Sequence, residues 1–183
     1  VARGGDVGER HEATGQDLRV QGEAVEKARG GGEAVRRQGR CEGQAQRSAD
    51  EAAVLATVQD LFRGMKTKDT ALMRSIFEPG ARLTGMRTRA DGSQVLQVIS
   101  ADQFIQFVAK DQRADWTERA FDPEVRIEGT LAQVWAAYDF HFGTTFSHCG
   151  VDAVQLLKRN GRWVIVAIAD TFQREGCPDR GSP

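Results

Sequence analysis

The sequence has little of what several classes of protein are built from. Its 183 residues include 3 Cys, 4 Pro and 1 Tyr, and its formal net charge is -1. Such a charge gives no electrostatic reason to expect binding to nucleic acid or to an anionic membrane. No apolar run approaches the roughly 20 residues of a membrane span, and the Gly- and Arg-rich start lacks the apolar centre of a signal peptide. We therefore expect a soluble, cytoplasmic protein with neither nucleic-acid nor membrane partners.

The cysteines do not predict a metal centre. Cys41, Cys149 and Cys177 are odd in number and widely spaced, which argues against a disulfide framework. His148 and Cys149 are neighbours, but adjacent residues of a strand point to opposite faces and cannot easily bind one ion. The sequence also contains no glycine-rich phosphate loop. We expect neither a metal nor a cofactor.

The first quarter of the chain differs in composition from the rest. Residues 1–47 contain no Phe, Trp, Tyr, Ile or Met, but 10 Gly. Such a segment cannot bury enough apolar surface to offset the entropy of ordering, so it is predicted to be disordered, with a frayed helix around Glu23 to Arg29. An alternative is that it arises from translation upstream of the true start. We expect one folded domain over residues 48–177 and a flexible tail over 178–183.

The domain is predicted to begin with two helices. Ser48 and Glu51 have the spacing of a capping box, and the apolar residues that follow recur at helical spacing. Asp69 can cap a shorter second helix, which Pro79-Gly80 would stop. The apolar stripe of the first helix consists of Val54, Leu55, Val58, Leu61, Phe62 and Met65.

A strand pair and a third helix follow. The strands are predicted over residues 81–87 and 94–99, and Ser100 with Gln103 repeats the capping signature at the start of the third helix. Residues 121–128 then alternate between apolar and charged side chains, which indicates a strand with one wet face. The proline inside this strand predicts an edge position or a bulge.

Three strands after residue 130 can be aligned against one another. Asn160-Gly161 between two apolar runs is a strong hairpin signal, because both turn residues must take positive φ. Without a bulge, this turn pairs Arg159 with Arg162 and Leu156 with Ile165. It then pairs Val154 with Ala167, Asp152 with Ala169 and Gly150 with Thr171. Upstream, the loop that starts at Gly143 pairs Phe140 with His148, Tyr138 with Gly150 and Ala136 with Asp152.

One face of these strands predicts a ligand pocket. It is mostly apolar, yet it carries Tyr138, His148 and Asp152 beside residues with almost no side chain, a combination that suggests a cavity. Asp170 falls on the opposite face in this register, but a single bulge would bring it inside. His141, close to a hairpin tip, is expected to be solvated. The predicted pocket residues are Trp116, Tyr138, Phe140, His148, Gly150, Asp152, Ala167, Ala169 and Asp170.

Each polar candidate has a second interpretation. His148 is either a pocket acid or base or a histidine satisfied by a backbone carbonyl. Asp152 is either a base whose pKa is raised by its apolar surroundings or a buried carboxyl bonded to backbone or to arginine. Tyr138 is either a hydrogen-bond donor to the ligand or part of the wall, and Trp116 is more often packing than a ligand platform.

The opposite face of these three strands is too apolar to be fully solvated and too polar to be a core. Such a composition is typical of an interface with another subunit. We therefore expect a homodimer through this outer face of the sheet. The residues expected at its centre are Trp135, Ala137, Val151, Ala153, Val166 and Ile168.

The order of elements predicts an α+β fold, with helices over one face of a curved antiparallel sheet. This order, with the runs Ser147–Ala153 and Trp163–Thr171, resembles the nuclear transport factor 2-like (SnoaL-like) superfamily, in particular its bacterial "putative lumazine-binding" group. The resemblance covers residues 49–177. It implies a cone-shaped, cystatin-like sheet closed by helices, a pocket inside the cone and, in many members, a dimer.

Function remains a choice between hypotheses of different classes. The first is a domain that binds a small molecule in an apolar pocket with a few polar groups. The alternative is a cofactor-independent acid–base enzyme of isomerase, dehydratase or cyclase type, in which His148 and Asp152 move protons and Tyr138 polarises a substrate oxygen. A purely structural dimeric module would instead predict a filled cone.

Overall fold

The computed structural model describes residues 46–89, 91–181 and 183. Arg47–Pro183 form one compact unit, and its described residues build three helices and a six-stranded sheet. The disorder predicted for residues 1–47, and the frayed helix within it, fall almost wholly outside the described residues. Across the described ranges, none of the helices is long and apolar enough to cross a membrane.

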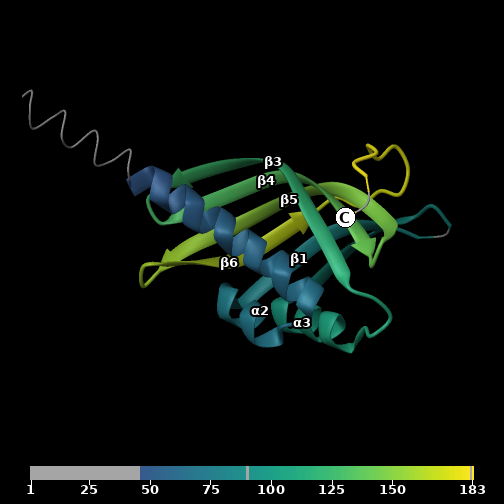
Figure 1. The fold of residues 1–183 in the computed structure, drawn as a ribbon, viewed down its shortest axis with the longest axis horizontal. Helices are drawn as coiled ribbons and strands as arrows, with labels where there is room; N and C mark the ends of the chain where they lie inside the picture. The colour runs from purple at the N-terminus through teal and green to yellow at the C-terminus, as the bar shows by residue number, and fades with distance from the viewer. Residues whose placement is uncertain (1–45, 90, 182) are drawn as a thin grey trace, which may run out of the picture. The chain divides into compact units, whose positions relative to one another are not determined.

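A helix through residues 46–67 lies across one face of the sheet (Figure 1). Its start was predicted at Ser48, but residues 46 and 47 are already helical, so Ser48 is not a cap. The apolar stripe behaves as its spacing predicts, since one side of the helix is buried against the sheet. Four of its side chains are no more than 4% exposed: Val54, Val58, Leu61 and Met65.

The two shorter helices begin where their caps predict. The Asp69 side chain accepts a hydrogen bond of 2.9 Å from the Leu72 backbone N–H at the start of α2 (Thr70–Ile76). Ser100 and Gln103 form a complete capping box at the start of α3 (Ala101–Lys110). However, α2 ends three residues before Pro79, because Phe77 already begins the first strand.

The sheet joins a hairpin to a meander. The hairpin consists of β1 (Phe77–Thr88) and β2 (Gln94–Ser100). The antiparallel meander consists of β3 (Trp116–Glu128), β4 (Leu131–Phe142), β5 (Thr145–Arg159) and β6 (Arg162–Asp170). β1 pairs in parallel with β6, which the sequence did not predict, and the strand order is β2-β1-β6-β5-β4-β3.

The α+β class, the curved open sheet and the position of β3 at its edge are confirmed (Figure 1). The β3 strand also carries the irregularity that its proline predicts, between Phe121 and Glu124. It begins at Trp116, five residues before the predicted start at Phe121. That extension places Glu118 opposite Phe140 in the sheet.

The β5–β6 register is right near the turn and wrong beyond it. Asn160 and Gly161 both have positive φ, and Leu156 lies opposite Ile165 as predicted. Gln155 then pairs with Ala167, so Val166 is an extra residue in β6. A bulge of this kind reverses the facing of every residue beyond it.

The bulge brings Asp170 to the inner face, and with it Ile168, so the expectation that Ile168 lies at the centre of the outer face is wrong. Asp152 lies opposite Asp170 instead of Ala169, and Ile168, Asp170 and Phe172 line the inner side. Ala169 is exposed, and neither alanine contributes to the pocket. The prediction that Ala167 and Ala169 line a pocket is therefore wrong.

A second bulge in β5 leaves the predicted inner face intact. Phe140 pairs with His148, but His141 pairs with Phe146, so Ser147 is the extra residue. The predicted pairs of Phe140 and of the residues before it in β4, including Tyr138 with Gly150, are confirmed.

A disulfide joins Cys149 in β5 to Cys177 in the C-terminal segment. The cysteine count argued against such a bond, and that inference was wrong because two cysteines far apart in sequence meet after β6 turns back along β5. Beyond the disulfide, Arg119 donates a hydrogen bond of 2.7 Å to the Gly181 carbonyl. Disulfides persist mainly in oxidising compartments, so this bond weighs against the cytoplasmic location, which stays a prediction.

We expect Cys177→Ser to lower the free energy of unfolding by about 2 to 4 kcal/mol relative to the oxidised protein, because the bond closes a long loop. Urea unfolding followed by circular dichroism would measure this difference. In the presence of dithiothreitol, the parent should fall to the stability of the variant. An unchanged midpoint under both conditions would show that the bond contributes nothing to stability.

Candidate functional site

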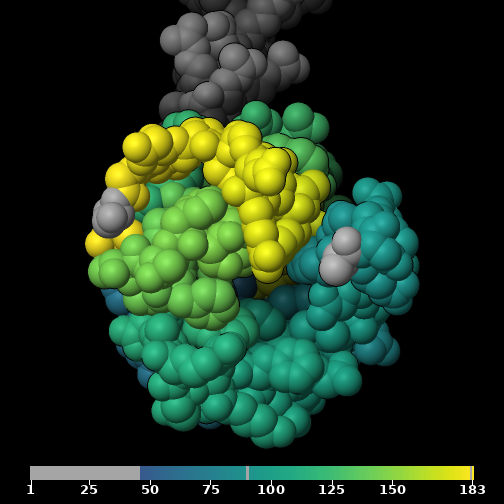
Figure 2. Space-filling model, turned by 90° about the vertical axis from the view of Figure 1, so that its right-hand side faces the viewer, coloured from purple at the N-terminus to yellow at the C-terminus, as the bar shows by residue number. Residues whose placement is uncertain are grey.

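A cavity of about 250 Å³ lies between the inner face of the sheet, α3 and the N-terminal helix. In the space-filling view the molecule is hollowed between the teal segment that contains β1 and β2 and the yellow C-terminal segment (Figure 2). Aromatic rings supply much of the lining: Phe104, Phe107, Trp116, Tyr138, Phe140, Phe142 and Phe172. The polar lining residues include Arg87, Gln97, Glu118, His148, Asp152 and Asp170.

Of the predicted pocket residues, Trp116, Tyr138, Phe140, His148, Asp152 and Asp170 line this cavity. Gly150 faces inward but does not line it, because the space above its Cα is already filled. A Cβ there would lie 2.1 Å from the Thr171 carbonyl oxygen and 2.8 Å from Tyr138 Cε1. The glycine thus admits close packing of Tyr138 and the C-terminal segment, and it creates no free volume.

Two carboxyl groups meet on the inner face. Glu118 of β3 and Asp152 of β5 both line the cavity, and their carboxyl groups lie close enough for a hydrogen bond between them. Such a bond requires one proton shared by the pair. Asp152 is 8% exposed, and burial raises its pKa to about 7. Burial, followed by the charge of Asp152, also raises the pKa of Glu118 well above its usual range.

Asp170 has a different partner. Its carboxylate accepts two hydrogen bonds, of 2.8 and 3.1 Å, from Arg87 Nη2. Gly85 lies beneath this ion pair, and a Cβ there would lie 2.3 Å from both Arg87 Nη1 and Asp170 Oδ1. Burial raises the pKa of Asp170, while the Arg87 guanidinium opposes that shift. Glycine at position 85 is what lets the ion pair lie against the sheet.

His148 is held between two phenyl rings. It stacks on Phe140 at 4.8 Å and on Phe172 at 4.1 Å between ring centroids. Burial, followed by the charges of Arg87 and Arg174, lowers its pKa to about 4. His148 is therefore neutral at pH 7, and Ser147 Oγ lies 3.0 Å from its Nδ1. As a neutral ring it serves stacking and hydrogen bonding better than proton donation.

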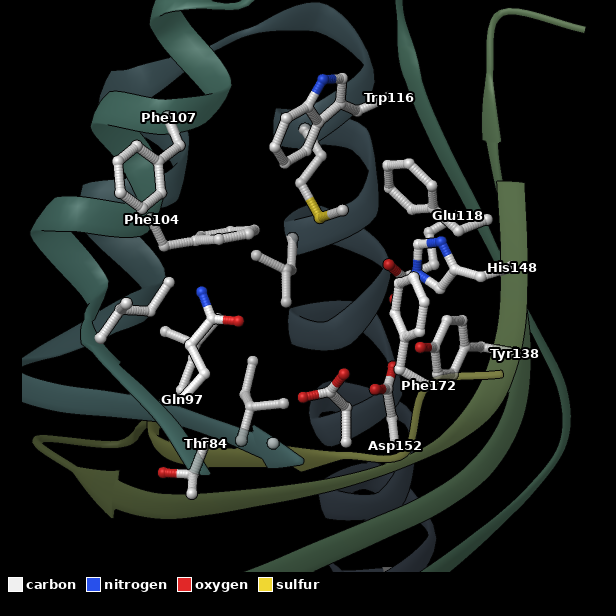
Figure 3. Close-up of a pocket in the computed structure, with 18 of the residues that line it drawn as sticks. Thr84, Gln97, Phe104, Phe107, Trp116, Glu118, Tyr138, His148, Asp152 and Phe172 are labelled. Carbon is white, nitrogen blue, oxygen red and sulfur yellow. The ribbon is translucent and has the colours of Figure 1, made fainter. Parts of the chain in front are cut away.

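Tyr138 also stays neutral, because burial and then the charge of Asp170 raise its pKa above the usual value. Its hydroxyl donates a hydrogen bond of 2.7 Å to the Thr171 carbonyl. The proton of Tyr138 is thus committed to the backbone, and only its oxygen lone pairs remain for a ligand. Figure 3 shows Tyr138, His148, Phe172 and Asp152 on one side of the cavity, Phe104 and Phe107 on the other, and Trp116 between the two sides at the top of the view.

Sequence reasoning missed Glu118 and Arg87. The signal for Glu118 was the alternation Trp116, Glu118, Ala120, which continues the inner face of β3 upstream of its predicted start. Arg87 was the last residue of a predicted strand, but its role depends on the parallel pairing of β1 with β6. A local pattern cannot predict such a long-range pairing.

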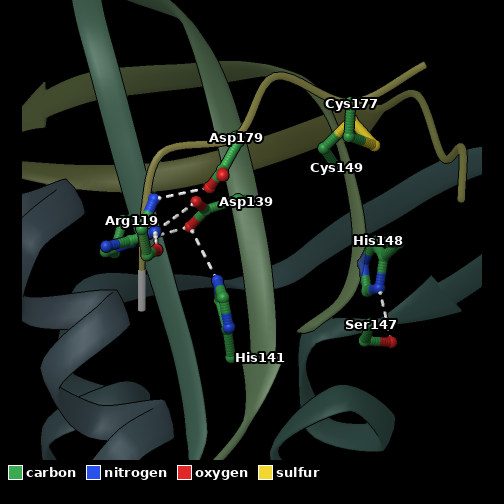
Figure 4. A network of polar contacts seen from close by, with 9 residues as sticks. Arg119, Asp139, His141, Ser147, His148, Cys149, Cys177 and Asp179 are labelled. Carbon is green, nitrogen blue, oxygen red and sulfur yellow. Dashed lines mark hydrogen bonds and ion pairs between the residues drawn. A yellow bond between two sulfur atoms is a disulfide. The ribbon is translucent and has the colours of Figure 1, made fainter. Parts of the chain in front are cut away.

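A second polar cluster lies on the outer side of the sheet (Figure 4). Arg119 binds the Asp139 carboxylate, with Nε 2.9 Å from Oδ1, and Asp139 Oδ1 lies 3.5 Å from His141 Nε2. His141 is 4% exposed, so the expectation that it is solvated was wrong. Across the described ranges, no three His, Cys, Asp or Glu side chains are grouped to hold one metal ion.

Solved structures with the same fold include several proteins of unknown function. An NTF-2-like protein from Silicibacter pomeroyi is 21% identical, and the match covers 69% of this chain and 98% of that one, with a TM-score of 0.52. A cystatin-like protein from Nostoc punctiforme is 11% identical over 69% and 93% of the two chains, with a TM-score of 0.55. The association domain of C. elegans CaMKII is 18% identical over 67% and 95%, with a TM-score of 0.53.

Among curated proteins no match was found. A family described as "Putative lumazine-binding" matches residues 49–169. This range includes most of the helix across the sheet and all six strands up to Ala169, and therefore most of the residues that line the cavity. The chain thus belongs to the "Putative lumazine-binding" family and has the nuclear transport factor 2-like fold.

Proposed function

We propose that the domain binds a small, largely apolar molecule in the cavity between the sheet and the helices. The observation that carries this proposal is the combination of aromatic walls with a hydrogen-bonded carboxyl pair inside one cavity of about 250 Å³. Ligand sites typically combine apolar walls with a few converging polar groups in this way. The family description supports a small-molecule ligand.

The residues that line the cavity offer two kinds of contact to a ligand, apolar contact and hydrogen bonds. Trp116 and Phe140, whose rings meet edge to face at 5.6 Å between centroids, offer flat apolar contact. The Glu118–Asp152 pair holds its one proton between the two carboxyl groups, so it offers acceptor oxygens to a polar end of the ligand. His148 and Tyr138 shape the wall beside this pair.

A second candidate is the acid–base enzyme. It is favoured by the pKa of about 7 for Asp152, because a general base works best when its pKa is close to the working pH. In this version, Asp152 and Glu118 move the proton, and His148 does not. Such an enzyme would exchange the methyl protons of 2-acetylnaphthalene for deuterium in D2O. Exchange by the parent at the rate of Asp152→Asn would count against it.

Blocking the cavity tests the proposed binding. Gln97 of β2 is exposed and lines the cavity, so it lies at the opening, whereas Gln94 on the same strand does not line it. We expect Gln97→Trp to weaken binding of 1-naphthalenemethanol by at least about tenfold, and Gln94→Trp to leave it unchanged. Isothermal titration calorimetry would measure both. Equal binding by the parent and by Gln97→Trp would mean that the molecule binds elsewhere.

We also propose a homodimer through the outer face of the sheet. Trp135 is 49% exposed on this face, and it lies opposite Ala153, which in turn lies opposite Ala169. Large exposed aromatic residues beside small ones are typical of interfaces between subunits. The solved association domain with this fold supports assembly in general terms.

Ala153→Arg should therefore convert the protein to a monomer at micromolar concentration, because it places a charge at the centre of the proposed interface. Light scattering after size-exclusion chromatography would give the mass of each species. Thr144→Arg, in the exposed turn between β4 and β5, is the matched control and should leave the mass unchanged. A monomeric parent under these conditions would exclude this dimer.

A further inference from the structure

The cavity contains more acid than base. Glu118, Asp152 and Asp170 line it, and Arg87 is the single arginine or lysine among its lining residues. Arg87 is already paired with Asp170 through two hydrogen bonds. The Glu118–Asp152 pair is therefore left without a cationic partner among the residues that line the cavity.

The surroundings of the pair strengthen this imbalance. The charges that act on Glu118 come from Asp152, Asp170 and Asp139, all of them acidic. Asp152 is influenced by Asp170 and, in the opposite direction, by Arg87. Of the other titratable neighbours, Tyr138 stays neutral, and so does His148. With one shared proton, the pair still carries one negative charge that nothing in the lining neutralises.

The walls near the pair are suited to a cation. The Trp116 ring meets Phe104, Phe140 and Phe142 edge to face, at centroid distances of 5.6 to 6.3 Å. The faces of aromatic rings attract cations, and the attraction grows when water is excluded. A buried carboxylate beside aromatic rings complements a positive charge attached to an apolar body.

We infer that the ligand of this cavity is a monocation, a protonated amine on a flat apolar ring system, whose nitrogen contacts Glu118 and Asp152. This inference rests on the proposed function and adds the charge of the ligand to it. When the amine binds, the proton shared by the two carboxyl groups is released to solvent. The complex then holds two carboxylates and one ammonium, which is the same net charge as before binding.

Three probes with one ring system test the inference. They are 1-naphthylmethylamine, which is a cation at pH 7, 1-naphthalenemethanol, which is neutral, and 1-naphthoate, which is an anion. We expect the amine to bind at least about tenfold more tightly than the alcohol and the naphthoate not to bind detectably. Calorimetry in phosphate and in Tris, which differ in ionisation enthalpy, should show that the amine releases protons on binding and the alcohol does not.

Substitution of the two carboxyl residues tests whether the charged nitrogen of the ligand contacts them. The double variant Glu118→Gln/Asp152→Asn, which removes both carboxyl groups, should reduce the preference for the amine to less than about threefold, whereas Glu124→Gln, an exposed position on the same strand as Glu118, should preserve it. Equal binding of the amine and the alcohol would overturn the inference and leave the proposed function standing. A preference that survives in the double variant would also overturn it, because the cation would then lie elsewhere. If none of the three probes binds, both proposals fail.

Discussion

Asp152→Asn should make the folded protein more stable at pH 8 and change its stability little at pH 4. Burial raises the pKa of Asp152 to about 7 in the folded state, against about 4 in an unfolded chain. A raised pKa contributes stability that is fully present below the unfolded value and is lost as the pH rises through the folded value. The uncharged asparagine avoids that loss.

The expected size of the effect follows from the shift. About three pKa units correspond to about 4 kcal/mol. The gain of Asp152→Asn over the parent should therefore grow by about 3 to 4 kcal/mol between pH 4 and pH 8. The pH dependence of the parent's free energy of unfolding would not isolate Asp152. His148, with its pKa lowered to about 4, makes a contribution to that free energy that increases as the pH rises through the same range.

Urea unfolding of both proteins at a series of pH values measures this difference and cancels the contribution of His148. Glu124→Gln, at an exposed position on β3, provides the control. If the difference between Asp152→Asn and the parent is the same at pH 4 and pH 8, Asp152 is an ordinary carboxylate. The proton-sharing pair would then not exist.

Gly150→Ala should lower the free energy of unfolding by about 3 kcal/mol or more, which is the upper part of the range for overpacking. The added Cβ would lie 2.1 Å from the Thr171 carbonyl oxygen. That oxygen belongs to backbone that is held by the hydrogen bond from Thr171 N–H to the Val151 carbonyl. Neither side can move without breaking the junction between β5 and the C-terminal segment.

Chemical denaturation monitored by circular dichroism gives the size of this loss. Thr145→Val, at the exposed start of the same strand, should change stability by no more than about 0.5 kcal/mol. A Gly150→Ala protein as stable as the parent would show that the C-terminal segment does not pack against Gly150. In that case Phe172 and Tyr138 would not be held as described.

The predictable parts of this fold are those with local causes. The caps at Asp69 and Ser100 and the turn at Asn160-Gly161 each depend on a few neighbouring residues, and the structure confirms all of them. Strand pairing then follows from the turn until an extra residue intervenes. Val166 is such a residue, and no feature of its neighbours distinguishes it from an ordinary strand position.

The candidate site was only partly predictable for the same reason. Tyr138, His148 and Asp152 were placed on the inner face because the β4–β5 register is correct there. The bulge at Val166 exchanged Ala169 for Asp170, and the longer β3 added Glu118. Gly150 and the alanines were interpreted as missing volume, whereas the cavity is bounded by aromatic side chains from β3, β4, α3 and the C-terminal segment.

The most direct test of the binding site uses the three tryptophans, which lie in three different environments: the cavity wall, the core and the outer face of the sheet. The indole N–H of Trp116, in the cavity wall, donates to Asp111 Oδ2 at 3.2 Å, and that of Trp163, in the core, donates to Asp50 Oδ1 at 3.3 Å. Trp135 lies on the outer face and is 49% exposed. Adding 1-naphthalenemethanol to nitrogen-15-labelled protein should shift the Trp116 indole signal and leave those of Trp135 and Trp163 in place. A shift confined to Trp135, or no shift at saturating concentration, would contradict a ligand site in the cavity.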